Sequence, residues 1–174
     1  MTAEEFDWSE IEILILDDNA PFRNLVADVL RGSGVRNIHM AGDAGDAFNT
    51  LKTSLVDIAL VDFIMDPLDG AEFTRMVRTG SDSSNPELPI IIVTGDATAK
   101  TLDTVLKSGA HDFLVKPISA EALMARLHRT LTTPRQFVRD GSFYGPAPLA
   151  GDQPNKRKPA RTLGIKPRSI TPSI

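Results

Sequence analysis

The amino-acid sequence predicts an α/β protein with a doubly wound, five-stranded parallel sheet and five helices, followed by a C-terminal tail. Three observations support this fold class. Short aliphatic segments alternate strictly with longer segments of helical periodicity, the connections between them are short, and one apolar run, "IIIV", is continuous. Strands and helices that alternate in this way form parallel sheets with helices on both faces, so that central strands are buried from both sides.

Five short segments rich in Ile, Leu and Val have the length and composition of strands. The first of them, "IEILILDD", ends in two acidic residues. The third, "VDIALVD", ends in one. The expected strands are residues 11–18, 36–41, 56–62, 88–96 and 111–117.

Between the expected strands, apolar residues recur at the spacing of amphipathic helices. Pro21 suits the first turn of the first helix, Gly80 is expected to end the third, and Ser119 is expected to cap the start of the last. The expected helices are residues 20–34, 43–54, 69–80, 97–110 and 119–131.

Charge is distributed unevenly along the 174 residues. Residues 1–133 carry 11 Lys and Arg against 21 Asp and Glu, a net charge of −10, whereas residues 134–174 carry 8 against 2, a net charge of +6. We therefore divide the chain into an N-terminal extension, residues 1–10, one domain, residues 11–133, and a basic tail, residues 134–174.

The tail is rich in Pro and Gly and has no sustained apolar period, so we expect it to be largely disordered. The segment "FVRDGSFYGP", residues 137–146, is the exception. It contains three aromatic residues and a valine, which we expect to pack on the domain or on a partner.

Composition excludes several classes of protein. The chain has no cysteine, which rules out disulfides and thiolate metal sites. The acidic N-terminus does not have the pattern of a secretory signal, and no apolar run approaches the roughly 20 residues needed to cross a bilayer. We expect a cytoplasmic protein without membrane insertion.

Polar side chains stand at the carboxyl ends of four expected strands. They are Asp17 and Asp18 at the end of the first strand, Asp62 at the end of the third, Thr94 in the fourth and Lys116 in the fifth. Parallel α/β sheets bind ligands just outside the carboxyl ends of their strands. We therefore expect three carboxylates, a hydroxyl and an amine to converge in one pocket.

The chemistry of such a pocket favours phosphoryl transfer. Three close carboxylates repel one another, and Mg²⁺, which prefers oxygen ligands, compensates their charge. A carboxylate can attack phosphorus to form an aspartyl phosphate. Mg²⁺, the Lys116 ammonium and the Thr94 hydroxyl would then stabilise the charge on the transferred group.

Four motifs, "LILDDN", "ALVDFIMDPLDG", "PIIIVTGD" and "GAHDFLVKP", resemble those of the receiver domain of bacterial response regulators, the CheY-like family with a flavodoxin-like fold. The resemblance covers residues 11 to 132, with the motifs in the family's order and spacing. The resemblance implies that Asp62 is the phosphoacceptor, that Asp18 binds Mg²⁺ directly and that Asp17 binds it through water. It implies that the backbone carbonyl of Ile64 is a further Mg²⁺ ligand. It also implies that Thr94 and Lys116 contact the phosphoryl group and that Phe113 is the switch aromatic.

The sequence departs from the family pattern near the expected phosphoacceptor. Asp66 stands where receivers often have Pro, and Pro67 follows it, so we expect a re-shaped loop. We expect Asp66 and Asp69 to shape this turn and the next helix start rather than bind metal. Ile64 is apolar where many relatives are polar, and Phe113 replaces the commoner Tyr. The resemblance also implies that the bond between Lys116 and Pro117 is often cis.

The function implied is a stand-alone, single-domain response regulator of a bacterial two-component system. A histidine kinase or phosphotransfer protein would phosphorylate Asp62, and the change would bias a two-state equilibrium. Output would pass to a partner protein through the helices at 97–108 and 119–131 and the last strand. Nucleic acid is a less favoured partner of the basic stretch 155–161, and a homodimer remains open.

Two alternatives carry different functions. A haloacid-dehalogenase-like phosphatase also forms an aspartyl phosphate, but it needs a second acid two residues later, where this chain has Ile64. A phosphate-independent receiver-like scaffold would bind its partner without regulation, and the complete set of site residues argues against it. We therefore expect no turnover of a substrate beyond self-phosphorylation and autodephosphorylation.

Overall fold

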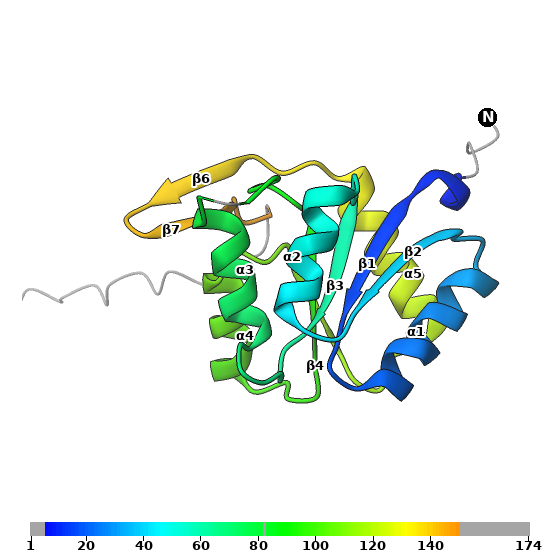
Figure 1. The fold of residues 1–174 in the computed structure, drawn as a ribbon. Coiled ribbons are helices and arrows are strands. Elements are labelled where there is room, and N and C mark those ends of the chain that lie inside the picture. The colour runs from blue at the N-terminus through cyan, green and yellow to red at the C-terminus, as the bar shows by residue number, and fades with distance from the viewer. Residues whose placement is uncertain (1–5, 82, 150–174) are drawn as a thin grey trace, which may run out of the picture.

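The computed structural model describes residues 6–81 and 83–149 (Figure 1). Its central sheet has five parallel strands in the order β2-β1-β3-β4-β5, which confirms the predicted fold class. Each strand is one to four residues shorter than expected, because the polar residues at its ends belong to loops. The strands are β1 Glu12–Leu16, β2 Asn37–Ala41, β3 Ile58–Asp62, β4 Ile90–Thr94 and β5 Asp112–Val115.

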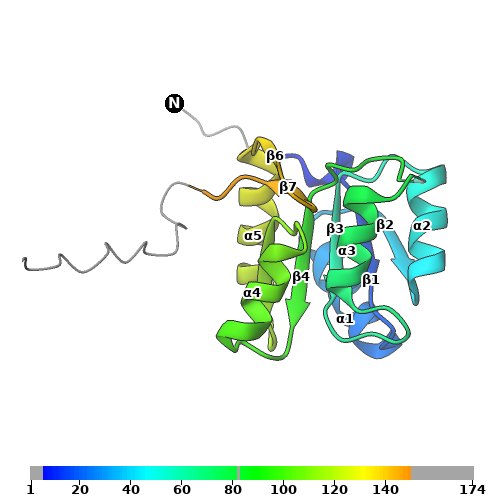
Figure 2. The same ribbon diagram turned by 90° about the vertical axis from the view of Figure 1, so that its left-hand side faces the viewer.

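Five α-helices cover the two faces of this sheet (Figures 1 and 2). α1 and α5 lie on one face, and α2, α3 and α4 lie on the other. No helix within the described ranges is long and apolar enough to span a bilayer. The helices are α1 Ala20–Gly32, α2 Ala44–Thr53, α3 Gly70–Thr79, α4 Ala99–Lys107 and α5 Ala120–Thr132, and a short 3-10 helix, η1 Trp8–Glu10, precedes β1.

The sheet separates two apolar cores. One face of the sheet packs with α1 and α5 around residues such as Leu30 and Leu127, and the other packs with α2, α3 and α4 around Phe73. All five residues of β3 and all five of β4 are buried. Each Å² of apolar surface that is buried stabilises the fold by about 25 cal/mol. Burial on both faces therefore holds these central strands in place, and with them the loops at their carboxyl ends.

Helix ends follow capping chemistry rather than hydrophobic period. α4 was expected from residue 97, but Thr98 lies outside the helix and accepts a hydrogen bond from the Thr101 N–H, so α4 begins at Ala99. It ends at Lys107, because Gly109 takes a φ of +95°, a conformation that favours glycine. Ser119 caps α5 as predicted, accepting a bond from the Ala122 N–H.

A two-stranded antiparallel hairpin, β6 Phe137–Asp140 and β7 Phe143–Pro146, follows α5. It coincides with the segment expected to pack on the domain or on a partner, and it lies against the C-terminal end of α3 (Figure 1). This exception to the expected disorder of the tail is ordered in the structure, because its aromatic residues have partners on the domain, such as Arg78 and His111 beside Phe137. Residues 150–174, including the basic stretch, lie outside the described residues, so disorder there stays a prediction.

Buried Arg78 holds the hairpin to the domain. Its Nε donates to the carbonyl of Gly109 at 2.9 Å, its Nη1 donates to the carbonyl of Pro86 at 2.9 Å, and its guanidinium lies 5.0 Å from the centre of the Phe137 ring. Tyr144 adds a hydrogen bond of 2.7 Å to Glu87. Burial lowers the pKa of Arg78 to about 10, so the side chain remains charged at neutral pH.

Candidate functional site

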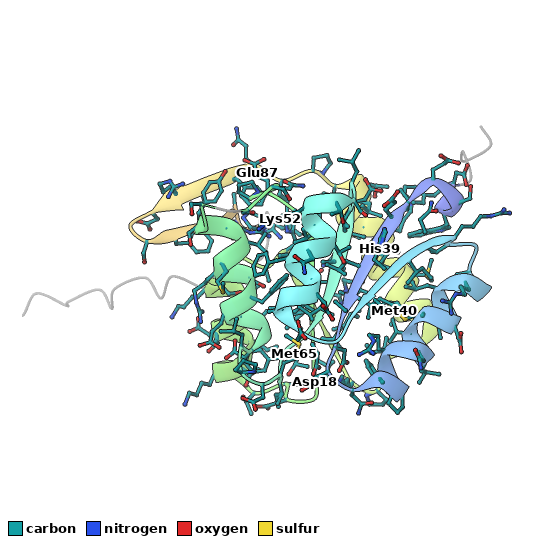
Figure 3. The ribbon with its side chains drawn as sticks, in the orientation of Figure 1. Asp18, His39, Met40, Lys52, Met65 and Glu87 are labelled. Carbon is teal, nitrogen blue, oxygen red and sulfur yellow. The ribbon has the colours of Figure 1, made fainter. Side chains whose placement is uncertain are left out.

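The register of the parallel strands brings the predicted site residues to one edge of the sheet. Leu16 pairs with Val61, so the residues that follow them, Asp17 just after β1 and Asp62 at the end of β3, lie at the same level. On the other side, Thr94 is the last residue of β4, and its carbonyl accepts a hydrogen bond of 2.8 Å from the Lys116 N–H. Figure 3 shows Asp18 at this end of the molecule and Glu87, beside the hairpin, at the other.

Three carboxylates form a cluster at this edge. Asp17, Asp18 and Asp62 each place a carboxylate oxygen within 4.8 Å of the other two. Asp17 is 1% exposed and Asp62 7% exposed, whereas Asp18 faces solvent. Burial raises the pKa of Asp17 and of Asp62 above the usual carboxyl value, and repulsion within the cluster adds to the rise.

Lys116 is the cation of the cluster. Its Nζ lies 2.9 Å from Asp62 Oδ1 and 3.9 Å from Asp17 Oδ2, and its hydrogen bond offsets part of the pKa rise that burial causes in Asp62. The ammonium also lies 4.1 Å from the centre of the Phe22 ring, a cation–π contact that fixes its position. The peptide bond between Lys116 and Pro117 is cis.

The hydrogen bonds of the Thr94 hydroxyl and the packing of Phe113 involve residues outside the cluster. The Thr94 hydroxyl donates to the carbonyl of Asp96 at 3.0 Å and accepts from the Asp96 N–H at 3.0 Å, so it is engaged with the loop after β4. Phe113 is half-buried and packs against the core on the α2–α4 side of the sheet. Neither side chain hydrogen-bonds to a carboxylate of the cluster.

The loop after Asp62 has an unusual course. The bond between Asp66 and Pro67 is cis, and the Ile64 side chain is exposed. Asp69 begins α3 with a capping box, in which its carboxylate accepts from the Glu72 N–H and the Glu72 carboxylate accepts from the Asp69 N–H. The expected role of Asp69 as a helix-start residue is thus present in the structure.

Sequence reasoning missed two supporting residues of the site. Arg23 donates from Nη1 to the Asp17 carbonyl, and its buried Nε has no hydrogen-bond partner among the described residues. Gly70 lies so close to β3 that an added Cβ would stand 2.4 Å from the Asp62 carbonyl oxygen. The signal for Arg23 was its place one turn into the helix that follows the acidic pair, whereas nothing local marked the contact of Gly70.

The family follows from comparison with known proteins. A model of the response regulator receiver domain matches residues 13–128, two thirds of the chain. The chain belongs to the response regulator receiver family. This confirms the resemblance found in its motifs.

Two curated proteins contain related receiver domains. The chain is 34% identical over 118 residues to the CAI-1 autoinducer sensor kinase/phosphatase CqsS of Vibrio cholerae, which covers 68% of this chain and 17% of that protein. It is 30% identical over 126 residues to the transcriptional regulatory protein ZraR of Klebsiella oxytoca, covering 72% and 27%. The matched region therefore spans about a quarter or less of the length of both relatives.

Solved receiver structures share the fold. The chemotaxis protein CheY4 of Vibrio cholerae is 27% identical with a TM-score of 0.64, over 70% of this chain and 98% of that one. The receiver domain of a sensor histidine kinase from Pseudomonas aeruginosa is 28% identical with a TM-score of 0.63, over 71% and 98%. In that structure a magnesium ion is coordinated in the active-site cleft.

Proposed function

We propose that this receiver domain accepts a phosphoryl group on Asp62 from the phosphohistidine of a histidine kinase or phosphotransfer protein. The observation that carries the proposal is the geometry around Asp62: a buried carboxylate 2.9 Å from a lysine ammonium, within a cluster of two further carboxylates. Family membership supplies the class of donor. An aspartyl phosphate is a product that only a nucleophilic carboxylate at an accessible site can form.

The acidic cluster fits Mg²⁺. It offers three oxygen donors close together and no nitrogen or sulfur donor, which is the ligand chemistry that Mg²⁺ prefers. The residues that would hold the ion are Asp17, Asp18 and Asp62, with the backbone carbonyl of Ile64. When bound, Mg²⁺ supplies charge neutralisation at the phosphoryl oxygens.

Three residues of the chain carry out the other parts of the phosphoryl transfer. A carboxylate oxygen of Asp62 forms a bond to phosphorus while the phosphorus–nitrogen bond of the donor breaks, and the imidazole leaves with the bonding electron pair and takes up a proton. Lys116 stays close to the reacting oxygen and stabilises the negative charge on the transferred group. Arg23 holds the backbone of Asp17 and so keeps the acidic pair in place.

Phosphorylation would act as a switch through Thr94 and Phe113. The hydroxyl of Thr94 now bonds to Asp96, and a phosphoryl group on Asp62 offers it a charged acceptor instead. Movement of Thr94 would admit Phe113 further into the core, and the face formed by α4, β5 and α5 would change its affinity for an output protein. On this proposal the protein works in the cytoplasm as a signalling component, without turnover of a separate substrate.

The test is phosphorylation of the purified full-length chain by phosphoramidate, a small donor with the same phosphorus–nitrogen bond. Mass spectrometry should find one added phosphoryl group in the presence of Mg²⁺ and none after chelation. Asp62→Asn should add none, and the control Asp66→Asn, an acid in the same loop, should behave as the wild type. Incorporation by Asp62→Asn, or sustained hydrolysis of p-nitrophenyl phosphate, would show that the proposal is wrong.

A further inference from the structure

A second cavity lies away from the acidic cluster, between the hairpin and the domain. Its volume is about 800 Å³, within the range of pockets that bind ligands. The C-terminal halves of α3 and α4, the strand β5 and helix α5 form part of its walls, and the β6–β7 hairpin with its flanking residues forms a further wall. The hairpin therefore turns an open surface of the receiver domain into a pocket.

The charge of this pocket is opposite to that of the rest of the protein. Six of its lining residues are basic and two, Asp103 and Asp112, are acidic, which gives a net charge of +4. All other residues of the chain carry 13 Lys and Arg against 21 Asp and Glu, a net charge of −8. The basic lining residues are Arg75, Arg78, Lys107, Arg126, Arg129 and Arg135.

Internal pairs use only part of this positive charge. Asp103 pairs with Lys107 at 2.6 Å, and Asp112 pairs with both Arg126 and Arg129, so two carboxylates compensate three of the six cations. Arg78 is buried and bonds only to neutral partners. Arg75 is exposed on α3 and forms no ion pair with any described residue. The pocket thus retains excess positive charge that an anionic ligand can neutralise.

Apolar side chains lie between these cations. Leu106 of α4 lines the pocket and is 49% exposed, and Phe113 and Phe143 line it as partly buried rings. A simple anion would leave these apolar surfaces in water. A nucleic acid backbone would also leave them uncovered, whereas a peptide with both carboxylates and an apolar side chain matches the cations and the apolar surface together.

The tail that follows the pocket has the same sign of charge. Pro148 lines the cavity, and residues 150–174 continue from there with 6 Lys and Arg against one Asp. Because the tail and the pocket are both positively charged, they repel each other, so the tail is a poor ligand for the pocket. An acidic segment would be attracted by the pocket and by the tail.

We propose that the pocket between the hairpin and the α3–α4–β5–α5 surface binds an acidic peptide segment of the output partner, with an apolar side chain of that segment inserted beside Leu106 and Phe113. The proposal rests on the proposed function for its partner, because Phe113 belongs both to this pocket and to the expected switch. It makes the hairpin part of the recognition surface.

The test uses the full-length protein and a fluorescein-labelled synthetic peptide that alternates Asp or Glu with Phe and Leu. Fluorescence anisotropy at low salt should show saturable binding, and a counterpart with Asn and Gln in place of the acids should bind far more weakly. Arg75→Glu should weaken binding about fivefold, and Leu106→Ser should weaken it about threefold. The charge-matched control Lys52→Glu, on the exposed side of α2, should keep wild-type affinity.

Three other results would overturn the proposal. Equal binding by wild type, Arg75→Glu and Leu106→Ser would place the peptide elsewhere. Single-stranded DNA that binds more tightly than the peptide and loses affinity in the same variants would assign the pocket to nucleic acid. Self-association that Arg75→Glu abolishes would assign it to a second copy of the chain. Asp62→Asn should still bind the peptide, so failure of phosphoryl transfer and failure of this pocket are distinguishable.

Discussion

The ammonium group of Lys116 lies 2.9 Å from a carboxylate oxygen of Asp62 and 3.9 Å from one of Asp17. It is thus the cation that compensates a cluster of three carboxylates, two of which are buried. The arrangement is only partly neutralised, because among the described residues Lys116 alone forms an ion pair with any of these three carboxylates, whereas Arg23 contacts the backbone of Asp17. Such a site should bind a further cation. Its affinity for a cation and the stability of the fold should both change when one of its charged residues is replaced.

Replacement of the lysine should separate metal binding from chemistry. Lys116→Met removes the ammonium that lies 2.9 Å from Asp62 and 3.9 Å from Asp17, so Mg²⁺ should bind to the acidic cluster about fivefold more tightly. Phosphorylation by phosphoramidate should become slower at saturating Mg²⁺, because the transferred group loses a stabilising charge. Isothermal titration calorimetry measures the first effect and mass spectrometry the second. Lys52→Met is the control, and weaker Mg²⁺ binding by Lys116→Met would contradict this electrostatic account.

Removal of one buried charge should stabilise the metal-free protein. Burial raises the pKa of Asp17 in the folded state above its value of 3.8 in the unfolded chain, so ionisation costs folding free energy as the pH rises through the raised pKa. Asp17→Asn removes this cost and should raise the free energy of unfolding at pH 7.

The Asn side chain can still accept the hydrogen bond from the Asn19 N–H, which the Asp17 carboxylate accepts at 2.8 Å. Urea denaturation at several pH values measures the gain, which should vanish near pH 3. Mg²⁺ should stabilise the wild type and so reduce the difference in unfolding free energy between Asp17→Asn and the wild type. A variant less stable than the wild type at pH 7 without metal would show that the buried charge is not the dominant effect.

The hairpin should depend on Arg78. Arg78→Met leaves the carbonyls of Gly109 and Pro86 without their donor and removes the contact with the Phe137 ring, so it should cost about 2–4 kcal/mol. The matched control is Arg75→Met, one turn earlier on the exposed side of α3, which should change stability by less than about 0.5 kcal/mol. Thermal denaturation compares the two, and equal effects would refute a specific role of Arg78.

His111 should make stability depend on pH. Burial, together with Arg78 and Arg135, lowers its pKa from 6.5 to about 3, so the folded state keeps the imidazole neutral while the unfolded chain protonates below 6.5. Its contribution to stability is therefore complete above pH 6.5 and decreases by about 1 kcal/mol per pH unit as the pH falls toward 4. His111→Gln should make the stability curve shallower by this amount, and parallel curves would contradict the prediction.

The alternation of patterns in the sequence was sufficient to predict the five strands of the parallel sheet and the five α-helices in order. The ends were less predictable, because they depend on single hydrogen bonds and backbone conformations. The N-cap of Thr98 and the positive φ of Gly109 shortened the helix expected at 97–110. Polar residues after an apolar run, such as Asp17 and Lys116, were included in expected strands although they belong to loops.

The candidate site was predictable where its residues stand at strand ends, since a parallel sheet brings those ends together regardless of detail. Asp62 and Lys116 are therefore adjacent in the structure as expected. Arg23 and Gly70 escaped notice because their role depends on how closely a helix approaches β1 or β3, which no local pattern encodes. The hydroxyl of Thr94 hydrogen-bonds to the backbone of Asp96 rather than to the cluster, because the loop after β4 brings Asp96 close to it.

The sequence by itself determined the sheet, its helical layers and the edge at which three acids meet a lysine, because periodicity and strand order follow from local residue types. Only the tertiary structure decided that residues 137–146 return to the domain, that Arg78 anchors them and that a cationic pocket results. These features join residues more than thirty positions apart through buried hydrogen bonds and charge, which depend on the distance in space rather than on the order of residues along the chain.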